Sequence, residues 1–151
     1  MEAQDTHLAI GFIMGVTYRK IAGLLQSRLR EYDITPEQWS VLFQIDRSAG
    51  LIQREIARRT GKDKPTTTRI LDHLEKKGLV YKEAGKQDRR SFLVFSTEQG
   101  KTMIRETLSI EAGVTEDVKE CMTGEEYGLL LELLMRINCH VGSLLDAEST
   151  L

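Results

Sequence analysis

The sequence predicts a mostly α-helical protein that carries one small β-hairpin. Apolar residues recur at helical spacing along most of its 151 residues. Two capping boxes, Thr35 with Gln38 and Thr123 with Glu126, mark the starts of helices. The spacing changes to the alternation of β-strands between residues 79 and 95. Because 40% of the residues are hydrophobic and 29% are charged, the chain is expected to form one globular domain or two small ones.

Two helices are predicted before residue 50. The first covers residues 6–32 and presents Ile13, Ile21 and Leu25 at helical spacing. The second follows the N-cap Thr35, has Pro36 in its first turn, and ends near residues 48–50. Its buried side is expected to consist of Trp39, Leu42, Phe43 and Ile45.

A short helix, a turn and a longer helix follow, which is the order of a helix-turn-helix. The short helix covers residues 53–60 and ends at Gly61. Asp63 then caps a helix that runs to about residue 77 and stops at Gly78. With about 100° between successive residues, its core side holds Thr67, Ile70, Leu71 and Leu74. The opposite side holds Pro65, Arg69, Asp72 and Lys76, flanked by Lys64, Thr66 and Thr68.

Two strands, residues 79–84 and 91–95, are predicted directly after this helix. The loop between them contains the cations Lys86, Arg89 and Arg90. A hairpin with a basic tip that follows a helix-turn-helix is a wing. The sequence therefore predicts a winged helix-turn-helix lobe over residues 34–97.

Two long helices are predicted after the hairpin. The first starts at Thr97 and runs to about residue 122, and the second starts at Thr123. The last helix carries apolar residues on most of its sides, so it is expected to be buried on most sides. A chain of this length cannot bury so much apolar surface alone, and a partner is expected to cover it.

Charge is distributed unevenly along the chain, whose net charge is only −2. Residues 47–90 contain 13 lysines and arginines but 6 aspartates and glutamates, whereas the remaining residues contain 8 and 17. A basic centre between acidic ends suits a lobe that faces phosphates. The alternative is a set of solvated helix faces that are basic, and charge alone leaves both interpretations open.

Several other classes of protein are disfavoured. The sequence lacks a glycine-rich phosphate loop, a nucleophile elbow and a cluster of metal ligands, so we expect no enzyme activity, no cofactor and no metal. Its longest strongly apolar run, residues 8–16, is too short to cross a bilayer and has no basic leader. The two cysteines, Cys121 and Cys139, are too few for a disulfide framework, and both fall in predicted apolar helices. We therefore expect a cytoplasmic protein without a membrane partner.

The sequence resembles the MarR family of bacterial transcription regulators. Residues 63–78 (DKPTTTRILDHLEKKG) resemble the family's recognition helix, and Asp88, Arg89 and Arg90 resemble its Asp-x-Arg wing signature. Two positions depart from the family pattern, with Pro65 where serine is common and Ser96 where leucine is usual. The resemblance implies a homodimer that binds double-stranded DNA at an inverted repeat, with repression as the commoner mode. Residues 1–33 and 98–151 would then form the helical dimerisation region.

DNA contacts are predicted on the outer face of the recognition helix and at the wing tip. Lys64 and Arg69 can reach phosphate or guanine, and Thr66 and Thr68 can reach phosphate or a thymine methyl group. The alternative for the threonines is helix-start chemistry. Asp72 would repel phosphate, so it is expected to pair with Arg69 or Lys76 along the helix. The complete set of predicted DNA-binding residues is Lys64, Pro65, Thr66, Thr68, Arg69, Lys86, Asp88, Arg89 and Arg90.

The wing residues have different expected roles. Arg90 is the candidate for insertion into a narrow A·T-rich minor groove, whose negative potential attracts arginine. Lys86 and Arg89 would hold the backbone, and Asp88 would position Arg90. A solvated hairpin tip is the alternative.

Many relatives respond to small phenolic or aromatic effectors that bind between the DNA-binding lobe and the dimer scaffold. Met14, Tyr18, Trp39 and Phe43 are the candidate lining residues here. The alternative, that they are simply core residues, is favoured because aromatics at helical spacing usually pack.

A protein-interaction adaptor without DNA binding is the rival function, which retention on heparin or DNA resin would exclude.

Overall fold

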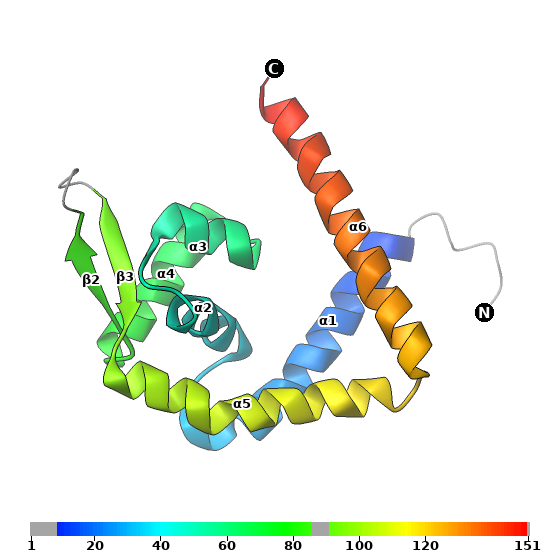
Figure 1. Cartoon of the computed structure of the whole chain (residues 1–151), viewed down its shortest axis with the longest axis horizontal. Coiled ribbons are helices and arrows are strands. Elements are labelled where there is room, and N and C mark those ends of the chain that lie inside the picture. Colours follow the sequence, from blue (N-terminus) through cyan, green and yellow to red (C-terminus); the bar gives the residue numbers. More distant parts are fainter. Residues whose placement is uncertain (1–8, 86–90, 151) are drawn as a thin grey trace. The chain divides into compact units, whose positions relative to one another are not determined.

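The structure is a computed structural model and describes residues 9–85 and 91–150 (Figure 1). Within these ranges most residues are helical, and three short strands form one sheet. The elements in chain order are α1 (Ala9–Arg28), the 3-10 turn η2 (Arg30–Tyr32), α2 (Pro36–Asp46), β1 (Leu51–Ile52), α3 (Gln53–Thr60), α4 (Lys64–Lys76), β2 (Val80–Ala84), β3 (Phe92–Ser96), α5 (Glu98–Lys119) and α6 (Gly124–Ser149). The predicted class, mostly α with a small β-hairpin, is confirmed.

The helix boundaries follow the caps in the sequence. The Thr35 hydroxyl accepts a hydrogen bond from the Gln38 backbone N–H at 3.1 Å, and the Gln38 side chain accepts one from the Thr35 N–H. Thr123 and Glu126 form the same reciprocal pair at the start of α6. Gly61 and Gly78 end α3 and α4 with φ of +64° and +74°. Residues other than glycine rarely adopt this left-handed region of backbone conformation.

Two local features differ from the sequence prediction. The first helix ends at Arg28, and the chain continues as the tighter turn η2, which ends where Asp33 adopts a left-handed φ of +49°. The sheet also contains the short strand β1, which was not predicted. Leu51 of β1 lies opposite Val94 of β3, and the strand order is β1-β3-β2. A strand of two residues is too short to show alternation, and its pairing depends on residues far along the chain.

The core lies among α2, α3, α4 and the sheet. Leu42 of α2, Ile56 of α3, and Leu71 and Leu74 of α4 are fully buried. Burial of each such side chain stabilises the fold by about 1.5–3 kcal/mol. The core side predicted for the recognition helix is confirmed, because all four of its predicted members are buried, namely Thr67, Ile70, Leu71 and Leu74.

The chain divides into two compact units, Met1–Ala112 and Gly113–Leu151. The second unit consists mainly of α6, on which Leu129, Leu133, Leu144 and Leu145 are 41–59% exposed. The helix α6 has 26 residues and contains an 18-residue window with a mean hydropathy of 1.3, so it is long and apolar enough to cross a membrane, judged by length and composition alone. The sequence analysis considered only uninterrupted apolar runs. It did not single out α6 because polar residues are spread along this helix.

One buried hydrogen bond joins α2 to α5. The Trp39 indole N–H donates to the Thr107 hydroxyl oxygen at 2.8 Å, and this hydroxyl donates to the Met103 carbonyl oxygen at 2.6 Å. Thr107 is fully buried. The first helical turns of α5 are therefore held against the winged helix-turn-helix by a polar contact that excludes water.

Replacing Thr107 by valine is expected to lower the free energy of unfolding by about 1–3 kcal/mol, because the indole N–H of Trp39 loses its only acceptor in a buried site. Thr102→Val, at a partly exposed position of the same helix, is the matched control and should change it by less than about 0.5 kcal/mol. Urea denaturation at equal protein concentration measures both. Equal stability of the two variants would contradict a role for this bond.

Candidate nucleic-acid interface

The start of α4 is fixed by three contacts. The Asp63 carboxylate accepts a hydrogen bond from the Thr66 backbone N–H at 2.7 Å, and this bond holds the pKa of Asp63 below its usual value. The Thr67 hydroxyl donates to the Asp63 carbonyl oxygen at 2.8 Å. Thr67 is thus buried with its hydroxyl satisfied, as the helix projection predicted, and does not belong to the outer face.

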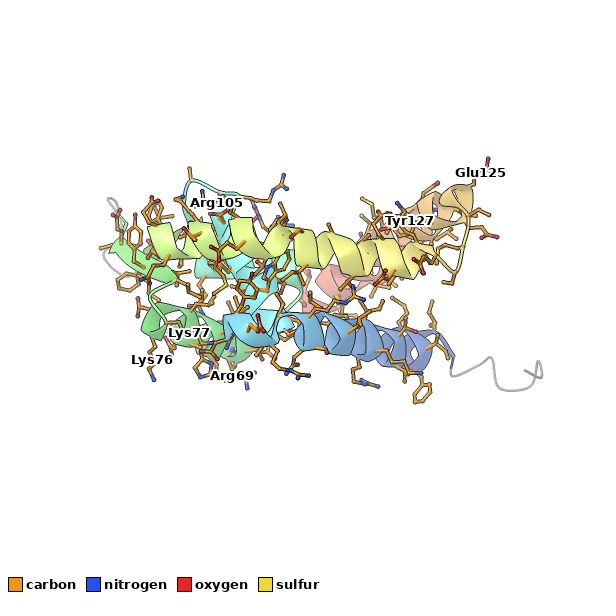
Figure 2. All side chains as sticks on the ribbon, turned by 90° about the horizontal axis from the view of Figure 1, so that it is seen from below. Arg69, Lys76, Lys77, Arg105, Glu125 and Tyr127 are labelled. Atoms are coloured by element: carbon orange, nitrogen blue, oxygen red, sulfur yellow. The ribbon has the colours of Figure 1, made fainter. Side chains whose placement is uncertain are left out.

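The outer face of α4 gathers the predicted contact residues. Lys64, Pro65, Thr68 and Arg69 are exposed and line a shallow hollow of about 500 Å³. Asp72, His73 and Lys76 complete its lining. Figure 2 shows Arg69 and Lys76 pointing outward from this helix. The outer face of α4 therefore presents three cations, Lys64, Arg69 and Lys76, beside small side chains.

Thr66 lies on another flank of α4. It is half-buried and lines a second hollow, of about 450 Å³, together with Ala22 and Gln26 of α1 and Pro36 of α2. The row of three threonines is therefore divided among the core, the outer face and the side toward α1.

Asp72 pairs across the fold, not along its own helix. The sequence predicted a partner in Arg69 or Lys76, and this prediction is wrong. The Asp72 carboxylate lies 3.6 Å from the ammonium group of Lys82 on β2. Both groups are partly exposed, so the pair contributes only about 0.2–1 kcal/mol. Its consequence is geometric, since it ties the recognition helix to the first wing strand.

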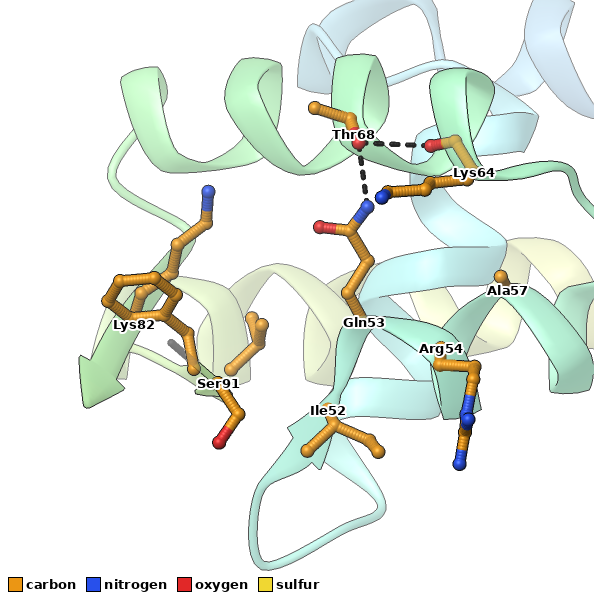
Figure 3. A pocket seen from close by; sticks show the side chains of 10 residues that line it. Ile52, Gln53, Arg54, Ala57, Lys64, Thr68, Lys82 and Ser91 are labelled. Atoms are coloured by element: carbon orange, nitrogen blue, oxygen red, sulfur yellow. Dashed lines mark hydrogen bonds between the residues drawn. The ribbon is translucent and has the colours of Figure 1, made fainter. Parts of the chain in front are cut away.

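A groove of about 680 Å³ lies between α3, α4 and the wing strands (Figure 3). Ile52 and Phe92 line it and are 39% and 49% exposed. Gln53, Arg54, Lys64, Thr68 and Lys82 supply its polar groups. Gln53 and Arg54 were not predicted as site residues, because no pattern in the sequence shows that the start of α3 lies beside α4.

The tip of the wing, with Lys86, Asp88, Arg89 and Arg90, lies outside the described residues. The strands that lead to it pair antiparallel from Val80 opposite Ser96 to Ala84 opposite Phe92. Ser96, which departs from the family pattern, is buried, and its hydroxyl donates to the Asp46 carboxylate at 3.0 Å. The serine therefore attaches the second wing strand to α2 by a hydrogen bond where leucine would pack.

A polar bridge supports the turn before α4. The Glu37 carboxylate of α2 accepts hydrogen bonds from the Tyr18 hydroxyl of α1 and from the Lys62 ammonium group in the turn. Burial, together with the hydrogen bond to the Glu37 carboxylate and its negative charge, raises the pKa of Tyr18 to about 12. Burial also raises the pKa of Glu37, but the bonds from Lys62 and Tyr18 outweigh it and lower the pKa below its usual value.

Two of the three arginines of α3 share one carboxylate on the same helix. Arg58 and Arg59 both donate to the Glu55 carboxylate and hold its pKa at about 2. Arg54 makes no ion pair among the described residues and lines the groove. The guanidinium of Arg54 is therefore available to an outside partner.

The four candidate effector residues have different environments. Trp39 is buried and bonded to Thr107, and its ring stacks on Phe43 with centroids 5.0 Å apart. Phe43 also lies under the Arg47 guanidinium. Met14 is exposed on α1, and Tyr18 is bonded to Glu37. The packing of Trp39 and Phe43 agrees with the alternative that these two residues belong to the core.

Metal-ligating side chains are not grouped within residues 9–85 and 91–150, and both cysteines are free thiols. No group of three or more histidine, cysteine, aspartate or glutamate side chains is arranged to hold a metal ion there. Cys121 and Cys139 are free thiols, and both are exposed, although the sequence placed them in apolar helices.

The arrangement of helix-turn-helix, adjoining hairpin and exposed outer face of α4 defines a winged helix-turn-helix protein. Residues 32–91 match the family model of the MarR family. This match over the winged helix-turn-helix lobe agrees with the resemblance in the sequence. The MarR family is a family of transcription regulators.

Solved structures extend the similarity over most of the chain. The transcriptional repressor CouR, bound to a 23-mer DNA duplex, is 25% identical with a TM-score of 0.80, over 91% of this chain and 98% of that one. A mutant MarR from E. coli, complexed with operator DNA, is 25% identical with a TM-score of 0.81, over 91% and 99%. A probable transcriptional regulator from Pseudomonas aeruginosa is 25% identical with a TM-score of 0.79, over 85% and 96%.

The Asp63 carboxylate that caps α4 is expected to make the stability of the folded chain depend on pH under acidic conditions. The pKa of Asp63 is lower in the folded chain than its ordinary value of 3.8, so its contribution is complete above that value and is lost as the pH falls through the folded-state pKa. Asp63→Asn keeps a capping oxygen that does not titrate. The stability advantage of the wild type over this variant should therefore shrink below about pH 4. Thermal melts between pH 3 and 7 measure it, and a constant difference would contradict the assignment.

Proposed function

We propose that the chain is a sequence-specific DNA-binding transcription regulator that acts in the cytoplasm, and that it is not an enzyme. One observation carries the proposal, namely that the outer face of α4 exposes Lys64, Thr68 and Arg69 while the opposite face is buried. An exposed helix that follows a helix-turn-helix fits the major groove of B-DNA. CouR and the E. coli MarR mutant, which share this fold, were solved with DNA bound.

The residues of α4 divide the contacts between phosphates and bases. Lys64 and Arg69 are long cations that reach phosphate oxygens or the O6 and N7 atoms of guanine. Pro65 supplies apolar contact, since it lacks a backbone donor and a hydroxyl group. Thr66, on the flank toward α1, is assigned to a phosphate. The basic middle of the chain supports this assignment because phosphate contacts supply most of the affinity.

The wing is assigned to the minor groove. Arg90 enters the groove, Lys86 and Arg89 contact the backbone, and Asp88 orients Arg90. The charge of this loop and its place directly after the recognition helix support the assignment.

A homodimer is proposed to cover the apolar side chains of the terminal helices. Large hydrophobic side chains are exposed on α1 and α6, which is more apolar surface than a monomer usually exposes. A second copy explains α6 better than a bilayer does, because Glu132, Arg136 and His140 lie in the middle of this helix and charge at the bilayer centre is costly. Residues 1–33 and 98–151 form the dimerisation region in this proposal, and residues 34–97 the DNA-binding lobe.

Two recognition helices related by a two-fold axis require an inverted-repeat operator whose half-sites lie about one helical turn apart. The proposed mode is repression, which is the function named for CouR. Release by a small phenolic or aromatic effector is proposed as the regulation, with Tyr18 and Met14 of α1 as the accessible members of the candidate set. Trp39 and Phe43 can contribute only if their packing changes.

Arg69→Ala is expected to weaken binding to DNA and to reduce its salt dependence. Each phosphate contact contributes about 0.9 to the slope of log K against log salt, so a dimer that loses two contacts should lose about 2. Arg105→Ala is the matched control, since Arg105 is an exposed arginine on α5, which Figure 2 shows apart from Arg69. Fluorescence anisotropy at several salt concentrations measures both slopes. Equal slopes for the wild type and Arg69→Ala would contradict a phosphate contact.

Leu133→Glu is expected to dissociate the dimer. A charge buried without a partner costs about 3–5 kcal/mol, which raises the dissociation constant of the dimer about 100-fold or more. Glu132→Gln, at the neighbouring exposed position, should leave it unchanged. Sedimentation equilibrium measures the dimer, and circular dichroism checks that the variant keeps its helices. A folded Leu133→Glu variant that remains fully dimeric would contradict the proposed interface.

A further inference from the structure

A hydrogen bond links the start of α3 to the outer face of α4. Gln53, the first residue of α3, donates an N–H of its amide to the Thr68 hydroxyl oxygen at 2.6 Å. The Thr68 hydroxyl donates in turn to the Lys64 carbonyl oxygen at 3.0 Å. Figure 3 shows both bonds within the groove between α3, α4 and the wing strands.

The direction of these two bonds follows from the chemistry of the groups. A carbonyl oxygen only accepts, so the single hydroxyl hydrogen of Thr68 is directed at Lys64. Gln53 must therefore be the donor in its bond to Thr68. Because Thr68 has no hydrogen left to donate, it can offer a base its methyl group or the remaining lone pair of its hydroxyl oxygen. The partner of a methyl group in the major groove is the C5-methyl of thymine.

Gln53 retains one donor and one acceptor. Its amide carries two N–H groups and one carbonyl oxygen, and only one N–H is used by Thr68. The second N–H and the oxygen make no hydrogen bond within the described residues. One donor beside one acceptor matches the major-groove edge of adenine, which presents the acceptor N7 and the donor N6.

The surroundings of this pair suit a DNA strand. Arg54 and Lys64 line the same groove and form no ion pair among the described residues, and Lys82 lies across from them. Cations of this kind complement the phosphates that flank a base pair. Exposed Ile52 and Phe92 give the groove an apolar wall against which sugars and base edges can pack.

We propose that Gln53 and Thr68 act as one base-recognition pair that selects an A·T base pair in each half-site. Gln53 binds the adenine edge, and its bond to Thr68 turns the threonine methyl group toward thymine. This inference rests on the proposed function, since it names part of the sequence preference of that DNA-binding surface.

The test is selection of bound sequences from a random duplex library by the full-length protein and its variants. The wild type should enrich an A·T pair at two positions related by two-fold symmetry. Gln53→Ala should lose that preference by about tenfold at those positions alone. Gln53→Glu should favour cytosine there instead, because a carboxylate accepts from the cytosine amino group. Gln44→Ala, a glutamine of α2 outside this groove, should select the wild-type sequence.

A double-mutant comparison tests whether the two residues act together. Thr68→Val keeps a methyl group but removes the hydroxyl that Gln53 holds, so Gln53→Ala should cost less in this background than in the wild type. Additive losses would overturn the pairing.

Affinity for random DNA shows that each variant is folded, and it should be the same for Gln53→Ala and the wild type. If the wild type selects a sequence and Gln53→Ala selects the same one, or loses random and selected DNA equally, the inference is overturned and the proposed function stands. If the wild type enriches no sequence, the proposed function itself fails.

Discussion

The burial of one face of α4 is the constraint on which the rest of the lobe depends. Leu71 and Leu74 are fully buried, and Ile70 is nearly so. Since successive residues of a helix are about 100° apart, this burial fixes which side chains face outward. Thr67 can lie in the same face because its hydroxyl is satisfied by the Asp63 carbonyl oxygen. The outward position of Lys64 and Arg69 is therefore a consequence of apolar packing and not of any attraction between them.

Polar contacts orient α4 once its inner face is buried, but they contribute little to the stability of the fold. Lys62 before α4 is held by Glu37, and Lys77 after α4 donates to the Gln38 side chain that also closes the capping box of α2. Asp72 holds Lys82 on β2 from the middle of the helix. Each such contact is worth little near the surface. Together they connect both ends of α4 to α2 and its middle to the wing, so that helix and wing present one surface.

The features that the sequence predicted are local ones. Caps such as Thr35, helix-ending glycines such as Gly61 and the buried face of α4 depend on residues within one or two turns of each other. The features that it missed join distant parts of the chain. Asp72 was assigned to partners on its own helix because the approach of Lys82 depends on tertiary structure, and Gln53 was passed over because its partner Thr68 lies 15 residues away. Strand β1 was missed because its partner β3 lies far along the chain.

The central claim about this protein is that a dimer presents two copies of the outer face of α4. The terminal helices set the separation between the two copies. The most direct test is hydroxyl-radical footprinting of the full-length protein on fragments that it selects from the host genome. Two protected tracts related by a two-fold axis, with centres about one helical turn apart, are the predicted result. A single unpaired tract, or protection that extends evenly along every fragment, would contradict it.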